Sequence, residues 1–452
     1  MRSGFTTGTC AAVAARANMQ ALALGAFPQM CQIMTPKGVL AVMEICDGVL
    51  EEGYACCGVH KDSGDDPDVT NGTWVGTAIF AKNGNPTFES LWERVALEGY
   101  LYRAYAGEVW IGILGGKGIG RATKAGLSCP IGHAAINPIP REMLARAVAD
   151  GVRDFFYRQG EPDFAESEAA VQAVEAKESF LRQLLEEKER LFVAEVRIPE
   201  GEHLAQKTFN PNLGIVGGLS VLGTSGIVEP MSEDALRETI RLELHMKAVE
   251  GRQRLILTPG NYGETFLKEA YSLSLKEAVK CSNFVGDAFC MAEEEGYEAV
   301  LFVGHIGKLI KVSLGVMNTH SRYGDRRMEG FLEAVQSDWK RQPRARQCKK
   351  EQEILEKLRC ANTSEEALSC LEKEGILEPV MNEIVLRIQK QLQEHLRKEQ
   401  PSFKQTRMKV EVLVFSSRMG LLAKTAGAEA LIGQIQEESQ KSQGETGAEK
   451  SL

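Results

Sequence analysis

The sequence lacks the signatures of several protein classes. Its 11 cysteines include no Cys-x-x-Cys pair, so neither a zinc site nor a disulfide framework is predicted, and their odd number favours a reducing compartment. No apolar run approaches the roughly 20 residues that span a bilayer. Arg16, Asn18 and Gln20 interrupt the N-terminal stretch where a signal peptide would need its apolar core. We therefore expect a soluble, cytoplasmic protein without membrane contact.

An excess of positive charge is also missing. The chain has 53 Lys and Arg against 62 Asp and Glu, which gives a net charge of −9. Proteins that follow the phosphate backbone of nucleic acids need a basic excess, so no nucleic-acid partner is expected. An anionic ligand of this protein must instead meet a local basic pocket.

Nucleotide and metal motifs are absent as well. No Gly-x-Gly-x-x-Gly follows a predicted strand, and Gly118 follows Lys117 where a P-loop requires Ser or Thr. The segment 62–68 carries four aspartates, but their spacing misses the calcium-binding EF-hand pattern. We expect no metal site. Clustered carboxylates raise one another's pKa, so Asp65 or Asp66 is a candidate general base, and a solvated turn is the alternative.

Glycine is abundant, and the run 208–232 is the most informative of its clusters. Glycines there alternate with β-branched residues, and Ser232 then caps a predicted helix. Strand, open loop and helix in this order are typical of a cofactor site. Glu229, Glu233 and Asp234 crowd the helix start, and each carboxylate would repel a nearby phosphate by roughly 4 kcal/mol. The pattern favours a cationic ligand with ribose hydroxyls, such as S-adenosylmethionine, and an ordinary capped helix is the alternative.

The distribution of glycine and apolar residues divides the chain. We predict an α+β N-terminal domain followed by an α/β Rossmann-like domain with a largely parallel sheet and a helical C-terminal extension. The predicted parts are an α+β domain over 1–206 with a helical insertion over 164–190, an α/β domain over 207–435 that is mostly helical from 331 to 400, and a disordered tail over 436–452. Predicted strands include 38–45, 109–114, 191–198, 255–257, 299–303 and 409–416.

Several polar loops are candidates for binding carboxylates. Thr6 and Thr7 precede an alanine-rich helix, where hydroxyls and free backbone N–H groups attract anions, unless they only cap the helix. The remaining candidates are cations, with one histidine that titrates near neutrality among them. These are Lys117, Arg121, Lys124, Arg141, His320, Arg322 and Arg326. A basic loop by itself is equally typical of solvated surface.

Taken together, seven segments resemble one known family. They are Arg2 to Ala12, Lys61 to Gly72, Gly115 to Thr123, Ala135 to Arg141, Thr208 to Ser232, Pro259 to Gly263 and Thr319 to Arg322. In this order they are similar to the cobalt-precorrin-5B C(1)-methyltransferase family of anaerobic cobalamin biosynthesis, over most of residues 1 to 435. The stretch 164–190 and the tail after 436 depart from the family pattern.

The resemblance implies methyl transfer from S-adenosylmethionine to ring carbon C-1 of a cobalt-containing tetrapyrrole polycarboxylate, with cobalt present only as part of the substrate. On this interpretation the methyl donor is held by Gly214, Gly217, Gly218 and Glu229. The substrate carboxylates are held by Thr6, Thr7, Lys117, Arg121, Lys124, Arg141, Arg322 and Arg326, and the catalytic candidates are Asp65, Asp66 and His320. A non-catalytic tetrapyrrole carrier and another Rossmann-like enzyme are the alternatives, and homo-oligomer formation is left open.

Overall fold

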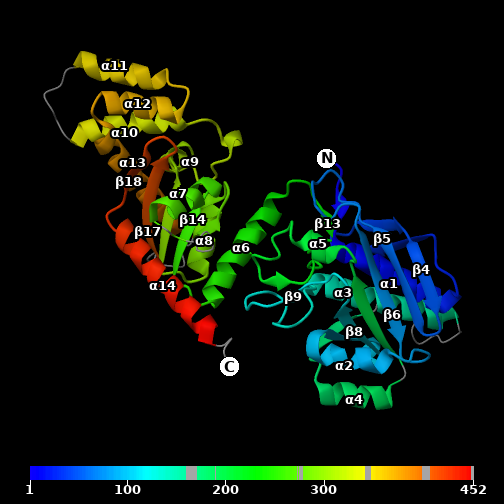
Figure 1. Cartoon of the computed structure of the whole chain (residues 1–452). Helices are drawn as coiled ribbons and strands as arrows, with labels where there is room; N and C mark the ends of the chain where they lie inside the picture. The colour runs from blue at the N-terminus through cyan, green and yellow to red at the C-terminus, as the bar shows by residue number, and fades with distance from the viewer. Residues whose placement is uncertain are drawn as a thin grey trace. The chain divides into compact units, whose positions relative to one another are not determined.

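The computed structural model describes residues 1–158, 170–188, 190–271, 273, 278–341, 348–399 and 408–448. The chain forms two compact units, Met1–Ser232 and Glu233–Leu452. Both combine sheets with helices, so the chain is a mixed α/β protein (Figure 1). No helix of the described residues is long and apolar enough to cross a membrane.

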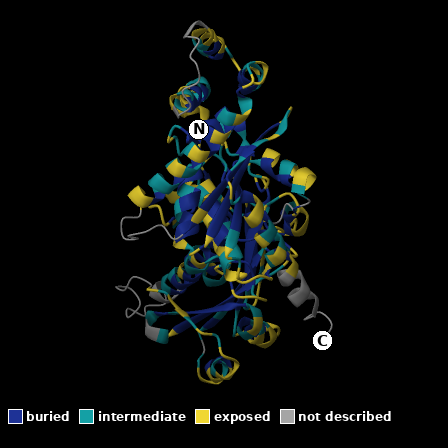
Figure 2. Cartoon of the chain, turned by 90° about the vertical axis from the view of Figure 1, so that its left-hand side faces the viewer, coloured by how far each residue is buried: buried dark blue, intermediate teal, exposed yellow. Residues whose placement is uncertain are grey.

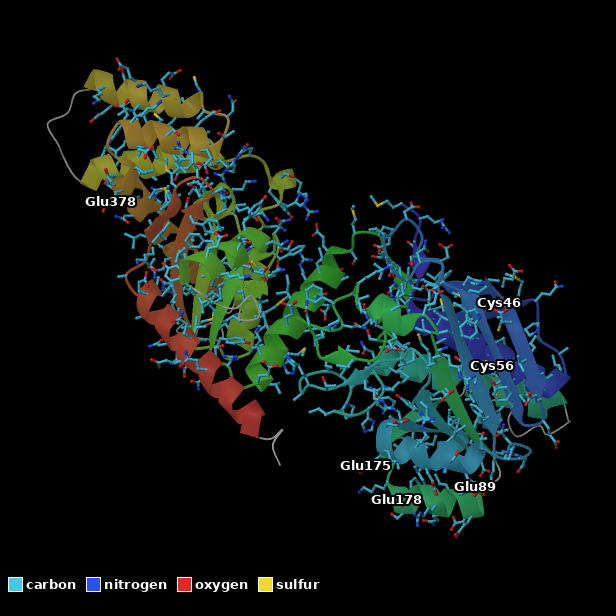
Figure 3. The ribbon with its side chains drawn as sticks, viewed as in Figure 1. Cys46, Cys56, Glu89, Glu175, Glu178 and Glu378 are labelled. Atoms are coloured by element: carbon cyan, nitrogen blue, oxygen red, sulfur yellow. The ribbon has the colours of Figure 1, made fainter. Side chains whose placement is uncertain are left out.

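Unit 1 is built on a seven-stranded mixed sheet with the order β10-β7-β8-β11-β6-β5-β4. Its strands are β4 (Cys46–Glu51), β5 (Tyr54–His60), β6 (Trp74–Ala81), β7 (Tyr100–Ala104), β8 (Val109–Gly115), β10 (Gln172–Val174) and β11 (Leu191–Arg197). β8 and β11 run parallel, and the other neighbours are antiparallel. Cys46 on β4 and Cys56 on β5 (Figure 3) are free thiols, as are the other cysteines whose side chains the structure describes.

Helices cover both faces of this sheet because side chains alternate along its strands. Ile111 and Ile113 pack with α1 (Thr7–Leu24) and α3 (Pro138–Arg158), whereas Trp110 and Leu114 pack with α2 (Phe88–Glu98) and α4 (Glu178–Glu187). The alanines of α1 allow a close approach to the sheet, and most of them are fully buried. The central strands β5, β6, β8 and β11 are mostly buried, and Figure 2 shows strands in the colour of buried residues beside helices with exposed outer faces.

Short elements complete unit 1. They are β1 (Gly4–Phe5), the hairpin of β2 (Met30–Met34) and β3 (Leu40–Glu44), η1 (Tyr105–Gly107), β9 (Arg121–Ala122), α5 (Gly201–Ala205), β12 (Ile215–Val216) and β13 (Ile227–Val228). β12 pairs with β9 and β13 pairs with β1. The run 208–232 therefore belongs to unit 1, and the division of the chain lies after Ser232 rather than after residue 206 as the sequence predicted. Backbone pairing with residues far away in the sequence holds the run there.

Unit 2 contains a five-stranded sheet with the order β15-β14-β16-β17-β18. Its strands are β14 (Arg254–Thr258), β15 (Ala278–Lys280), β16 (Ala299–His305), β17 (Lys409–Ser416) and β18 (Gly420–Lys424). The first four are parallel to their neighbours, and β18 is antiparallel to β17. The predicted strands 255–257, 299–303 and 409–416 are confirmed, since apolar runs buried on both faces are typical of parallel strands.

The helices of unit 2 also cover two faces. Leu257 and Phe302 face one hydrophobic cluster, and Ile256 and Leu301 face the other, which includes residues of α7 and α14. The helices are α6 (Glu233–Val249), α7 (Asn261–Tyr271), α8 (Val285–Glu294), α9 (Ile306–Val312), η4 (Ser321–Tyr323), α10 (Arg327–Arg341), α11 (Cys348–Arg359), α12 (Ser364–Lys373), α13 (Leu377–Glu399) and α14 (Ala428–Ala448). The helical section after 331 is confirmed by α10 to α13.

Two predictions about irregular segments were wrong in detail. The predicted disordered tail is helical as far as Ala448, because α14 packs Ile435 against the sheet and pairs Glu438 with Arg254. The predicted helical insertion is a strand, β10, followed by the helix α4, whose apolar stripe of Leu181 and Leu184 is buried against α2. Residues 159–169 and 189 of this region, and 449–452 of the tail, lie outside the described residues.

Candidate functional site

A polar cleft of about 320 Å³ opens in unit 1 at the end of β8. Its volume is at the lower end of the range of small-molecule sites. It is lined by Arg94, Glu98, Gly115, Gly116, Lys117, Gly118, Ile119, Arg121, Ala134, Glu195 and Gly217. The cleft thus collects three candidates from two distant motifs: Lys117, Arg121 and Gly217.

Close backbone contacts shape the wall of this cleft. Gly118 has φ +77°, and a Cβ added there would lie 1.8 Å from the carbonyl oxygen of Ile198. A Cβ on Gly218 would lie 2.3 Å from the carbonyl oxygen of Gly118. The backbone N–H of Leu219 donates to that same oxygen at 2.9 Å. Only glycine permits such an approach at these two positions, so Gly218 has a structural reason for its identity.

The charges in the cleft are mostly paired. Arg121 forms an ion pair with Glu98, and Arg94 also pairs with Glu98 at 2.5 Å. Burial raises the pKa of Glu98, but the hydrogen bonds from Arg121 and Arg94 outweigh it and lower the pKa overall. Glu195 is paired with Arg197 at 2.6 Å.

Lys117 is the exception. Its side chain lines the cleft and is exposed to solvent. Within the described part of the chain it forms neither an ion pair nor a side-chain hydrogen bond; only its carbonyl is engaged, accepting from Ile198 N at 2.9 Å. Lys117 is therefore the cation of this cleft that is available to a ligand carboxylate.

The other basic candidates of unit 1 are not among the residues that line the cleft. The Arg141 guanidinium lies 3.9 Å from the centre of the Tyr100 ring and donates to Ser128 O at 3.3 Å. Its Nε is buried without a hydrogen-bond partner among the described residues. The aliphatic part of Lys124 lies against Gly214, where an added Cβ would be 2.5 Å from Lys124 Cγ.

Thr6 and Thr7 contact the glycine-rich run. Thr6 Oγ1 accepts from Thr9 N at 3.3 Å as the N-cap of α1. Thr7 Oγ1 accepts from Leu222 N at 3.1 Å, and both threonines are 5% exposed. The Thr7 hydroxyl thus joins α1 to the run 208–232 and the Thr6 hydroxyl caps α1, so both have a structural role that needs no ligand.

Two of the four aspartates in the segment 62–68 have lowered pKa values, whereas the sequence predicted raised ones. The pKa of Asp62 is lowered by its hydrogen bond with Arg2. Burial raises the pKa of Asp68, but the Lys61 ammonium at 2.6 Å outweighs it and the pKa falls. The expected mutual raising of pKa is therefore wrong for these two, because each carboxylate has a cationic partner. Asp65 accepts from Arg2 N at 2.5 Å, and Asp66 accepts from Met231 N at 3.2 Å.

The structure brings together only some of the four residues that were predicted to hold the methyl donor. Gly217 lines the cleft, and its neighbour Gly218 packs against the lining residue Gly118. Gly214 O accepts from the N–H of Thr123 at 2.9 Å, at the end of the β9–β12 pair. Glu229 is not a lining residue of the cleft, and it forms an ion pair with Lys37.

In unit 2 the predicted cations already have acidic partners. Arg322 holds Glu233 through two contacts of 2.5 and 2.9 Å, and Arg326 donates to Glu329 at 2.7 Å. Glu233 belongs to the acidic helix start that the sequence assigned to a cationic ligand, so part of that charge is neutralised by the protein itself. His320 Nδ1 accepts from Arg322 N at 3.1 Å and caps η4.

Sequence reasoning left Lys308 and Lys311 out of the site. Both lie on α9, directly after β16 and close to the carboxyl edge of the parallel sheet. The sequence did place the loop 304–308 behind the predicted strand 299–303, where ligands of such sheets bind, but neither lysine was among the predicted site residues. Among the described residues no cluster of His, Cys, Asp and Glu could hold a metal ion.

The chain matches the models of one known protein family. The family model CbiD matches residues 1–156 and 163–230, and the model "CbiD, C-terminal domain" matches residues 318–426. The chain belongs to the CbiD family. The CbiD models cover four of the motif segments in unit 1 completely and also cover the segment at 319–322.

Relatives of the same family are similar over most of the chain. A protein of Ruminiclostridium cellulolyticum named cobalt-precorrin-5B C(1)-methyltransferase is 34% identical over 86% of this chain and 84% of its own length. One of the same name from Clostridioides difficile is 32% identical over 95% of this chain and 96% of its own. A crystal structure of a cobalamin biosynthesis protein (cbiD) from Archaeoglobus fulgidus is 22% identical, covering 68% and 78% of the two chains, with a TM-score of 0.32.

Proposed function

We propose that this protein is a methyltransferase that transfers the methyl group of S-adenosylmethionine to C-1 of cobalt-precorrin-5B and so gives cobalt-precorrin-6A in anaerobic cobalamin biosynthesis. The observation that carries this proposal is membership of the CbiD family, with relatives of that named activity aligned over more than four fifths of both chains. Cobalt enters the reaction as part of the substrate.

The chemistry needs little from the protein beyond placement and charge. S-adenosylmethionine supplies an electrophilic methyl group on a sulfonium. Ring carbon C-1 forms a bond to this methyl carbon while the carbon–sulfur bond breaks, S-adenosylhomocysteine leaves, and a proton is released. Holding two reactants in line contributes about 7 to 11 kcal/mol in well-aligned reactions. Asp65 and Asp66 are the proposed acceptors of the proton.

Lys117 and Arg121 are proposed to bind carboxylate arms of the tetrapyrrole. Their placement in one cleft supports the proposal, and so does the lack of an internal partner for the Lys117 ammonium in the described chain. Arg121 would exchange its contact with Glu98 for a contact with substrate. Gly217 in the same cleft offers a backbone with φ +82° and no side chain within 4 Å of an added Cβ, which leaves room for a ligand.

We further propose that unit 2 is Rossmann-like, because its parallel strands are connected outward in both directions from the centre of the sheet. Four parallel strands with helices on both faces support this description, and the edge strand β18 is an antiparallel addition. The proposed ligands are small molecules only.

The proposal is tested with the purified full-length protein under anaerobic conditions. S-adenosylmethionine labelled in its methyl group is incubated with cobalt-precorrin-5B, and label in the corrinoid fraction is measured with time. We expect enzyme-dependent transfer of one methyl group per corrinoid. Binding of cobalt-precorrin-5B without transfer of label would instead identify a carrier and refute the enzyme.

A further inference from the structure

The sheet of unit 2 has a topological switch point between β14 and β16. From β14 the chain passes through α7 to β15 on one side, whereas from β16 it proceeds to β17 on the other side. The connections therefore diverge, which in open parallel sheets leaves a crevice outside the carboxyl ends of the two strands. Ligands of open parallel sheets bind in such crevices. Residues 259–261 and 305–308 are the loops at this point.

Two lysines beside the crevice have only neutral hydrogen-bond acceptors. Lys308 Nζ donates to Pro259 O at 3.0 Å and to Asn283 Oδ1 at 3.2 Å. Lys311 Nζ donates to Thr319 O at 3.4 Å, and Lys311 is 8% exposed. Among the residues that the structure describes, no carboxylate forms an ion pair with either ammonium group.

The nearby arginines differ sharply from these lysines. Arg322 and Arg326 are each held by a glutamate, and Arg327 donates to Asp325 at 2.7 Å. Asp325 senses the charge of Lys311, but its short contact is with Arg327. Folded proteins pair buried charges because removing an ion from water costs several kcal/mol. An unpaired, half-buried ammonium at a ligand-binding edge therefore indicates an anion that the chain does not itself supply.

A buried hydroxyl lies beside Gly307, the residue before Lys308. Ser364 is 4% exposed, and its Oγ has no hydrogen-bond partner in the described chain. Ser364 is the first residue of α12, and its Oγ lies 3.6 Å from the position of a Cβ added to Gly307 in the first turn of α9. The Gly307 N–H is already used, since it donates to His305 Nδ1 at 3.1 Å. Burial lowers the pKa of Lys308, as expected for a cation that lacks a counter-ion.

We propose that this crevice, which we call the switch-point site (Pro259, Asn283, Gly307, Lys308 and Ser364), binds a ligand carboxylate through the Lys308 ammonium. The inference rests on the proposed function for the ligand's identity. That reaction offers two sources of a carboxylate: the aminoacyl end of S-adenosylmethionine and the acid arms of the tetrapyrrole. The site's chemistry is the same for both, and binding experiments separate them.

Two substitutions test the site from opposite directions. Lys308→Met removes the charge, whereas Asn283→Asp places a carboxylate beside Lys308 and supplies an internal counter-ion. Both are expected to weaken binding of the external carboxylate by at least about tenfold, the effect of one charged hydrogen bond. Asn283→Asp is also expected to raise the melting temperature, which a mere packing role of Asn283 would not produce. Lys390→Met, at a lysine that is 71% exposed on α13, is the matched control.

Three ligands are titrated calorimetrically into the full-length wild type and each variant. S-adenosylhomocysteine carries the aminoacyl carboxylate, 5′-methylthioadenosine lacks it, and cobyrinic acid is a stable corrinoid polycarboxylate. Weakening for S-adenosylhomocysteine with unchanged methylthioadenosine affinity assigns the site to the methyl donor. Weakening for cobyrinic acid alone assigns it to the tetrapyrrole, and either result supports an anion site.

Unchanged affinity of both variants for both carboxylate ligands would overturn the proposal, as would a wild type that binds neither. If Lys308→Met fails to fold, the titrations of Asn283→Asp decide. Methyl transfer by the wild type is measured separately. A wild type that binds S-adenosylhomocysteine through Lys308 but transfers no methyl group would refute the proposed function and leave the switch-point site in place.

Discussion

At the scale of single residues, the decisive property of each candidate cation is whether the chain already supplies its counter-ion. Arg121, Arg322 and Arg326 have internal carboxylates, whereas Lys117 and Lys308 have none among the described residues. The Asp325 and Glu329 partners lie within three residues of their arginines, so sequence spacing could have indicated them. Glu98 and Glu233 lie far away in sequence, and only the fold brings them to Arg121 and Arg322.

Lys117→Ala tests the cleft of unit 1. Because Lys117 has no internal ion pair in the described chain, its removal is expected to leave the melting temperature unchanged. The KM for cobalt-precorrin-5B should rise roughly 10- to 100-fold, with a much smaller change in the affinity for 5′-methylthioadenosine. Lys177→Ala, at a lysine that is 66% exposed beside α4, serves as the control. Equal KM values for the two variants would show that the cleft does not bind the substrate.

The buried Lys61–Asp68 pair is expected to stabilise unit 1. Lys61 is 1% and Asp68 27% exposed in their side chains, so Asp68→Asn leaves a buried ammonium without its counter-ion. We expect a loss of about 2 to 3 kcal/mol in the free energy of unfolding at neutral pH, since partial exposure moderates the effect. Urea denaturation measures it. Asp62→Asn breaks an exposed contact with Arg2 and should have little effect.

The same pair gives a dependence on pH with a definite sign. The pKa of Asp68 in the folded state lies below its ordinary value of 3.8, because Lys61 and Thr70 outweigh the burial that raises it. Its contribution is therefore complete above the unfolded pKa and is lost as the pH falls through the folded pKa. Below about pH 4 the stabilities of wild type and Asp68→Asn should converge. Parallel stability curves throughout the acid range would contradict this role.

At the scale of elements, periodic apolar segments were predicted well and short irregular ones were not. β8, β11, β14, β16 and β17 follow from apolar runs that are buried on one or two faces. The run 208–232 was placed in the wrong part of the chain, because its partners β1 and β9 are distant two-residue strands. Short-range patterns cannot indicate such pairing. The tail after 436 was misread because α14 has few apolar residues beyond Ile435.

Gly218→Ala tests the backbone contact between the run 208–232 and the loop after β8. An added Cβ would lie 2.3 Å from Gly118 O, so one of the two loops must move. We expect a loss of about 1 to 3 kcal/mol in unit 1 and weaker binding in the cleft. Gly433→Ala is the control. Gly433 lies within α14, and a Cβ added there has no atom within 4 Å. This substitution should stabilise the protein by up to about 1 kcal/mol. Wild-type stability of Gly218→Ala would show that the loops can separate at no cost.

The C-terminal part of α14 is expected to support unit 2. A chain ending at Gln436 loses the ion pair of Glu438 with Arg254 and the buried Ser439. We expect a lower melting temperature, measured by circular dichroism, for this truncation. A chain ending at Ala448 keeps the whole described helix and should match the full-length protein. Identical melting of both truncations would restore the view of 436–452 as a dispensable tail.

At the scale of the whole molecule, the chain is an acidic protein with two separate hydrophobic interiors. The clusters of unit 1 contain residues up to Val221, and those of unit 2 begin at Ile240. We therefore expect two transitions in differential scanning calorimetry. Gly218→Ala should lower one of them and the truncation at Gln436 the other. A single transition that both changes shift equally would mean that the two interiors unfold together.

The proposed reaction specifies the ring carbon that receives the new methyl group. The most direct measurement is nuclear magnetic resonance of the corrinoid product formed by the wild type from cobalt-precorrin-5B and isotopically labelled S-adenosylmethionine. We predict one labelled methyl group, attached to C-1. A product labelled at another ring position, or no labelled product with protein that binds both reactants, would contradict the account.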